Sequence, residues 1–227
     1  MLNIYFDGEN FNETFDVHFT ERPIVPVAEM DYEVIQVPGR NGELTRELGY
    51  KNTVVPMSFN FIDYENAKKK MREITNWLID KKQFYFSDDE DVFRIVTKLN
   101  INSVFNRVNE LIGFVIEVET EPFWYEIEET ITITDTATFT NPSKIPVDAK
   151  MRVNGTGTCR VLLNDNQMVF TDVQGHVEVA NKNAFRNGVS QNNSMSGSYP
   201  ILKPGENTIT ISGQTTSVEI ELRWAYR

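Results

Sequence analysis

Apolar and polar residues alternate along two stretches in the second half of the chain, residues 147–154 and 218–226. The apolar members are Val147, Ala149, Met151, Val153, Val218, Ile220, Leu222, Trp224 and Tyr226. Successive side chains of a β-strand point to opposite faces, so this pattern predicts strands with one buried and one solvated face. Turn-forming pairs such as Asn154-Gly155 and Pro204-Gly205 recur at the intervals typical of an antiparallel sandwich. The second half is therefore predicted to be β throughout.

The first half mixes strand patterns with one helical pattern. β-Branched and aromatic residues bounded by turn formers predict strands at Leu2–Phe6, Phe15–Phe19, Asp31–Val37, Thr53–Phe61 and Leu111–Glu119. Residues 63–80 repeat apolar side chains at helical spacing, with Asp63 as the candidate N-cap, so a helix is expected to pack one face on a sheet. Gln83–Phe86 and Val92–Leu99 flank the acidic run Asp88–Asp91, which predicts a hairpin.

The composition changes between residues 121 and 146, where EPFWYEIEE gives way to threonine-rich sequence. We place a domain boundary near residue 128, which predicts domains at 1–128 and 129–227. The expected fold class is mainly β, with an N-terminal β-sandwich-like domain that carries one helix and hairpins, followed by an antiparallel β-sandwich. Asn187–Ser198 is polar and poor in core residues, so an exposed loop is expected there.

Charge is distributed unevenly along the 227 residues. Residues 1–130 hold 25 acidic and 13 basic side chains, a net charge of −12, whereas the remainder is close to neutral. A strongly acidic half repels phosphate, so binding to nucleic acid or to an anionic membrane through it is not expected. The longest apolar run, Leu111–Ile116, is far shorter than the roughly 18 residues of a membrane span, and the N-terminus does not resemble a secretory signal.

The residues that usually carry catalysis are scarce. His18 and His176 lie in different halves without a nucleophile motif, and Cys159 alternates with apolar residues as a buried small hydrophobe would. Asp88–Asp91 could attract calcium, but the spaced EF-hand ligand pattern is absent, and solvated acids are the favoured interpretation. The run Lys68–Lys70 is interpreted as the solvated side of a helix, where lysines pair with nearby glutamates. The sequence predicts no catalytic residues, no metal site and no cofactor.

Three aromatic residues are candidates for stacking on a sugar or another partner. Trp124 and Tyr125 are adjacent in EPFWYE, where an interdomain plug is the favoured alternative. Tyr199 lies next to the polar loop and is the better candidate for a sugar contact.

Several motifs, taken in order along the chain, resemble the distal tail (Dit-like) protein family of phages with long non-contractile tails. The segment VPGRNGEL at 37–44 is the first of them. The others are Thr53–Phe61, Asn76-Trp77-Leu78, Phe84-Tyr85-Phe86, Pro122-Phe123-Trp124, Asn141-Pro142, Val153–Gly157 and Tyr199–Asn207. The similarity covers nearly the whole chain, and the second half resembles the family's galectin-like sandwich.

The resemblance implies a structural role in the virion. First domains from six copies would form a ring at the tail tip that lets DNA pass without binding it, and the ring could stack back to back in vitro. The implied partners are a second copy of the chain, the tail tube protein, a tail-associated or tail-fibre protein and a receptor-binding protein. Assembly is expected in the host cytoplasm, with no membrane attachment.

The segment around VPGRNGEL is our candidate for the contact between copies. Its residues are Val37, Pro38, Gly39, Arg40, Asn41, Gly42 and Leu44. Together with the strand that follows, they would form an arm that embraces a neighbour, and an ordinary hairpin is the alternative. The main alternative function is an adhesin that binds cell-surface sugar through Tyr199 and Asn192–Ser198. A tail-tube or neck protein shares the ring but needs no appended sandwich, and an enzyme is the least favoured class.

Overall fold

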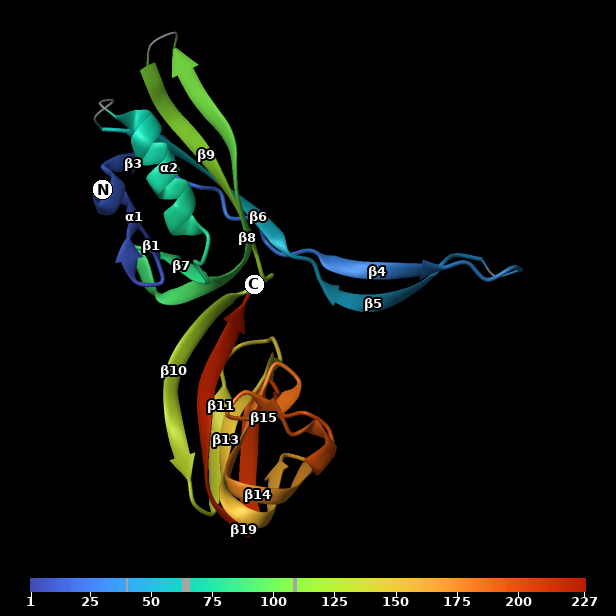
Figure 1. Ribbon diagram of the computed structural model, residues 1–227. Helices are drawn as coiled ribbons and strands as arrows, with labels where there is room; N and C mark the ends of the chain where they lie inside the picture. Colours follow the sequence, from blue (N-terminus) through green and yellow to red (C-terminus); the bar gives the residue numbers. More distant parts are fainter. Residues whose placement is uncertain (40, 63–65, 108–109) are drawn as a thin grey trace. The chain divides into compact units, whose positions relative to one another are not determined.

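The computed structural model of the chain describes residues 1–39, 41–62, 66–107 and 110–227 (Figure 1). The protein is mainly β, as the sequence predicts, and its long strands pair antiparallel. It divides into two compact units, Met1–Trp124 together with Arg227, and Tyr125–Tyr226. Each unit has a hydrophobic core of its own.

The first unit is built around β8, a long strand that takes part in two sheets. β8 pairs with β7 near its start and with β9 from Val96 onward, which gives the orders β3-β6-β9-β8 and β8-β7-β1-β2. The elements are β1 (Ile4–Phe6), β2 (Glu9–Asn10), α1 (Phe11–Phe15), β3 (Val17–Phe19), β4 (Met30–Ile35), β5 (Leu44–Tyr50), β6 (Thr53–Phe61), α2 (Ala67–Leu78), β7 (Gln83–Phe86), β8 (Asp89–Arg107) and β9 (Glu110–Thr120).

The core of the first unit is rich in aromatic rings. In β6 every second side chain is buried, from Thr53 to Phe61, as expected for a strand with one covered face. Phe59 stacks on Phe114 of β9 with ring centroids 5.5 Å apart. The ring of Trp77 on α2 lies 5.9 Å from that of Phe6 on β1 and 5.6 Å from that of Phe11 on α1, so the helix packs one face against the sheet and the short helix.

The helix at α2 is shorter than the sequence predicts. It spans Ala67–Leu78 rather than residues 63–80, and its N-cap is Asn66, whose φ of 61° places it in the left-handed region. Asn tolerates that conformation, and a left-handed residue ends the helical run on its N-terminal side. The expected cap Asp63 lies outside the described residues. The apolar stripe is confirmed, because Ala67, Ile74 and Leu78 are buried.

The predicted strand at Phe15–Phe19 is partly wrong. Residues 11–15 form the short helix α1, and only Val17–Phe19 is extended. The side chain of Asn10 accepts a hydrogen bond from the Glu13 N–H, and Asp16 adopts a left-handed conformation that ends the helix. These two caps, one a side-chain hydrogen bond and the other a backbone conformation, override the β-propensity of the phenylalanines.

The second unit consists of antiparallel strands that follow one another in a continuous order. The order is β16-β15-β14-β13-β19-β10, and β11 pairs with the first part of β19. The elements are β10 (Trp124–Ile133), β11 (Thr136–Asn141), β12 (Val147–Asp148), β13 (Lys150–Leu163), β14 (Asn166–Ala180), β15 (Asn183–Arg186), β16 (Val189–Ser190), the 3-10 turn η1 (Asn192–Ser194), β17 (Met195–Ser196), β18 (Ile201–Leu202) and β19 (Gly205–Tyr226).

The alternation in the second half is confirmed as the signature of one buried face. Met151 and Val153 of β13 pack in the core with Val218, Ile220 and Trp224 of β19. Two register shifts between Asn154 and Cys159 interrupt the regular pairing of β13 with β19. The polar segment 187–198 is largely exposed, as expected, although it contains short strands.

Asn207 is a buried polar residue that holds the turn before β19. Its Oδ1 accepts hydrogen bonds from the Lys203 N–H (2.9 Å) and from Asn164 Nδ2 (3.0 Å). Its Nδ2 donates to the carbonyl oxygens of Lys203 (2.8 Å) and Gly205 (2.9 Å). Because the residue is fully buried, water cannot replace these bonds.

We therefore expect Asn207→Ala to lower the free energy of unfolding of the second unit by about 2–3 kcal/mol, since it leaves buried polar groups unsatisfied. Urea unfolding of the full chain measures this loss. Asn193→Ala, at an exposed position of the same unit, is the matched control and should change stability by less than about 0.5 kcal/mol. Equal stability of the two variants would contradict the assigned role of Asn207.

Candidate functional site

A two-stranded hairpin extends away from the remainder of the first unit (Figure 1). It consists of β4 and β5, which pair with each other and form a sheet of their own. We call residues 30–50 the arm. Near its tip, Gly39 and Gly42 have φ angles of 82° and 81°, a conformation that favours glycine. The predicted turn in VPGRNGEL therefore lies at the end of a long projection.

The candidate contact residues from the sequence lie together in this distal part of the arm. Leu44 begins β5, and Arg40 lies outside the described residues. The others, all exposed, are Val37, Pro38, Gly39, Asn41 and Gly42.

Large apolar side chains of the arm face solvent. Their exposed fractions range from 37% to 56%, and they are Tyr32, Val34, Ile35, Val37, Leu44 and Leu48. The strand register distributes them over both faces, because Ile35 lies opposite Leu44 while Val34 of the other face lies opposite Thr45. Clustered exposed apolar surface is typical of a site that contacts another molecule. Most of the residues of the arm that the structure describes are exposed, whereas Met30, Asp31 and Tyr50 at its base are half-buried.

The base of the arm is fixed to the first unit. Lys51 Nζ lies 3.1 Å from Asp31 Oδ1, and the ring of Tyr50 packs against that of Phe123 with centroids 5.0 Å apart. The guanidinium of Arg227 lies 5.6 Å from the centre of the Tyr50 ring. These contacts involve the start of β4 and the end of β5, so they attach the base of the arm to the unit.

Sequence reasoning found the tip of the arm but missed the apolar residues along its length. Tyr32, Val34 and Leu48 were not among the predicted contacts. The signal for them was present in the run Tyr32–Val37, where apolar residues occupy both faces of the strand. In the structure these residues are exposed rather than part of a core.

The aromatic candidates Trp124 and Tyr125 pack within their own units. The Trp124 ring lies 6.2 Å from that of Phe84, and the guanidinium of Arg94 lies 4.8 Å from its centre. Tyr125 is buried, with the Arg223 guanidinium 5.1 Å from its ring centre.

Tyr199, the third aromatic candidate, is half-buried beside the polar segment. Its hydroxyl donates a hydrogen bond to Asn192 Oδ1 at 3.2 Å, and the same oxygen accepts one from the Ala184 N–H at 2.7 Å. The ring also packs against the core of the second unit. Its position therefore orders the polar segment.

The charged groups considered as chemical candidates have structural contacts. Asp88 forms an ion pair with Arg22, and Lys70 lies 3.3 Å from Asp16. Burial raises the pKa of the Cys159 thiol, which disfavours the reactive thiolate. In the parts of the chain that the structure describes, no three His, Cys, Asp or Glu side chains converge as metal ligands would. The helices of the same parts lack the length and apolar character needed to cross a membrane.

Comparison with solved structures shows that this fold occurs in hub proteins of phage adsorption apparatus. The chain is similar to the SPP1 Dit protein, described as a paradigm of the hub adsorption apparatus of phages infecting Gram-positive hosts, with a TM-score of 0.66, 13% identity and 99% of each chain covered. It is also similar to a chain of the phage P2 baseplate in its activated conformation with Ca, with a TM-score of 0.53, 11% identity and coverage of 98% and 97%.

A second baseplate structure from that phage, with Sr, gives a TM-score of 0.52 at 12% identity, with the same coverage. No protein-family profile matches the chain, and no curated protein matches it. The resemblance to distal tail proteins in the sequence is thus confirmed at the level of the fold.

Proposed function

We propose that this protein is the structural hub of a phage tail tip, in which copies join through the arm into a closed ring. The observation that carries the proposal is an arm with apolar residues on both faces, in a chain that matches the SPP1 hub protein over its whole length. In a single copy these side chains face water. Contact with a neighbouring copy would bury them, and each Å² of apolar surface removed from water would stabilise the assembly by about 25 cal/mol.

The ring is proposed to have six copies and to act as part of the virion. The first 130 residues of six copies would carry a charge of about −72, six times −12. Such a wall would repel the phosphates of passing DNA and release it readily. The tail tube protein, a tail-associated or fibre protein and a receptor-binding protein are the proposed neighbours, and none of these roles requires catalysis by this chain.

Light scattering of the purified full chain tests the ring directly. Six copies of 26.2 kDa give about 157 kDa, and a back-to-back pair of rings gives twice that mass. Electron microscopy of the same sample should show particles with a central opening. A 26 kDa species at tens of micromolar protein, without larger particles, would overturn the proposal.

A further inference from the structure

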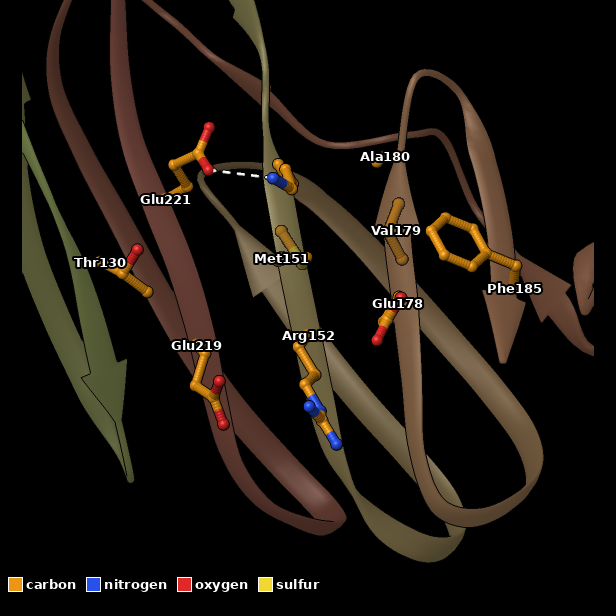
Figure 2. A pocket seen from close by; sticks show the side chains of 10 residues that line it. Thr130, Met151, Arg152, Glu178, Val179, Ala180, Phe185, Glu219 and Glu221 are labelled. Carbon is orange, nitrogen blue, oxygen red and sulfur yellow. Dashed lines mark hydrogen bonds and ion pairs between the residues drawn. The ribbon is translucent and has the colours of Figure 1, made fainter. Parts of the chain in front are cut away.

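The second unit has a hollow of about 270 Å³ on the polar side of its sheet (Figure 2). Its floor is formed by neighbouring segments of β13, β14 and β19, while Thr130 of β10 and Phe185 of β15 stand at opposite sides. All of these residues belong to the same unit. The volume is just below the range of about 300–1,000 Å³ found for small-molecule sites, which suits a ligand of one compact ring.

Three charged side chains form a row across the floor of the hollow. The strand register places Arg152 directly between Glu178 on β14 and Glu219 on β19. Phe185 lies opposite Glu178 on the next strand and extends the row at one end. Neighbouring strands are about 4.8 Å apart, so the row presents an aromatic ring, an acceptor, a donor and an acceptor in sequence.

The acceptors beside Arg152 are held by contacts within the sheet. Asn154 Nδ2 donates to Glu219 Oε1 at 2.9 Å. Glu178 Oε1 lies 3.8 Å from His176 Nε2. Glu221 lies opposite Lys150 rather than Arg152, accepts a hydrogen bond from Lys150 Nζ at 3.1 Å, has Arg223 Nε at 3.8 Å, and is only 16% exposed. A carboxylate fixed in this way needs little reorganisation to accept a hydrogen bond from a ligand.

Arg152 differs from these neighbours. Its guanidinium forms no hydrogen bond or ion pair with any residue that the structure describes, although carboxylates flank it on both sides. A guanidinium carries five N–H donors in a planar fork. These donors are therefore available at the centre of the hollow.

We propose that this hollow binds a neutral pyranose sugar. Vicinal hydroxyls both donate and accept, which matches a donor at Arg152 between acceptors at Glu178 and Glu219. The apolar face of the sugar ring would pack on Phe185. Three glutamates against Lys150 and Arg152 leave the lining with a net charge of −1, which disfavours an anionic sugar. This activity is independent of the hub role and uses residues other than Tyr199.

Saturation-transfer NMR and calorimetry on the full chain test the site. The probes are the methyl glycosides of glucose, galactose, rhamnose and N-acetylglucosamine, with glucuronic acid as the anionic comparison. We expect at least one neutral glycoside to bind with a Kd of about 1 mM, the range of a site this small, and glucuronic acid to bind at least ten-fold more weakly. Absence of binding by all four neutral glycosides at 20-fold higher concentration overturns the proposal.

Variants locate the binding within the second unit. Arg152→Ala and Phe185→Ala should each weaken binding by ten-fold or more, and Glu219→Gln by a smaller factor. Arg160→Ala, which removes an exposed arginine near the opposite end of β13, is the matched control and should bind as the original protein does. Circular dichroism confirms that each variant is folded. If Arg152→Ala does not fold, Arg152→Lys replaces it in the binding measurements. Binding that survives both Arg152→Ala and Phe185→Ala, or that is lost in Tyr199→Ala instead, rejects this site.

Discussion

Replacing Ile35 and Leu44 together with aspartate is expected to abolish self-association of the protein. These residues lie directly opposite each other on one face of the arm and are about 40% exposed. If a neighbouring copy covers that face, each aspartate must be desolvated in an apolar contact. We expect at least a 100-fold weaker association, so that light scattering at micromolar protein detects a single copy.

The control for this double variant is Leu162→Asp. Leu162 is an apolar strand residue of the second unit with 40% exposure, close to the 37% of Leu44. It should leave the particle mass unchanged, because it lies outside the arm. If the Ile35/Leu44 variant keeps the mass of the original protein, the arm is not the contact between copies.

Arg94→Ala is expected to produce the largest loss of stability in the first unit, about 3–5 kcal/mol. Arg94 is 1% exposed, and its Nη1 donates to the hydroxyls of Thr53 and Thr120, the latter at 3.0 Å. Its Nη2 donates to the carbonyl of Pro26 at 3.4 Å, and the guanidinium packs on Trp124. Truncation leaves both a cavity and buried hydroxyls without this donor.

Urea unfolding, followed by hydrogen exchange on peptides from residues 1–124, measures the effect in the unit that contains Arg94. Arg94→Lys keeps the charge but not the planar fork, so it should recover less than half of the loss. Arg72→Ala, at an exposed helical position, is the matched control with an expected change within about 0.5 kcal/mol. A loss below about 1 kcal/mol for Arg94→Ala would show that its hydrogen bonds do not stabilise the fold.

The sequence predicts most where a single physical effect dominates. Alternation identified the buried faces of β13 and β19, and β6 has the predicted bounds at Thr53 and Phe61. The helix boundaries were less well predicted because caps at Asn10 and Asn66 depend on side-chain bonds and backbone angles that propensity does not encode.

The interaction sites depend on juxtapositions that no sequence pattern contains. Arg94 lies in a strand whose sequence mixes polar and apolar residues, so the pattern alone does not show that it is buried. Only the fold shows that its side chain donates to two hydroxyls, one from β6 and one from β9. Likewise, Arg152, Glu178 and Glu219 are distant in the sequence and meet only through strand register. The turn at Gly39 and Gly42 was recognised because glycine itself carries that signal.

The open edges of the arm have a consequence for the protein before it meets a partner. A hairpin of two strands leaves backbone donors and acceptors unpaired along both outer sides, which invites indiscriminate strand stacking and aggregation. Charged residues interrupt its apolar side chains, among them the Glu33–Arg46 pair at 3.7 Å, and the register shift after Asp31 disturbs the regular ladder. Charged residues and an irregular ladder of this kind suppress aggregation of an exposed apolar hairpin before it binds its partner.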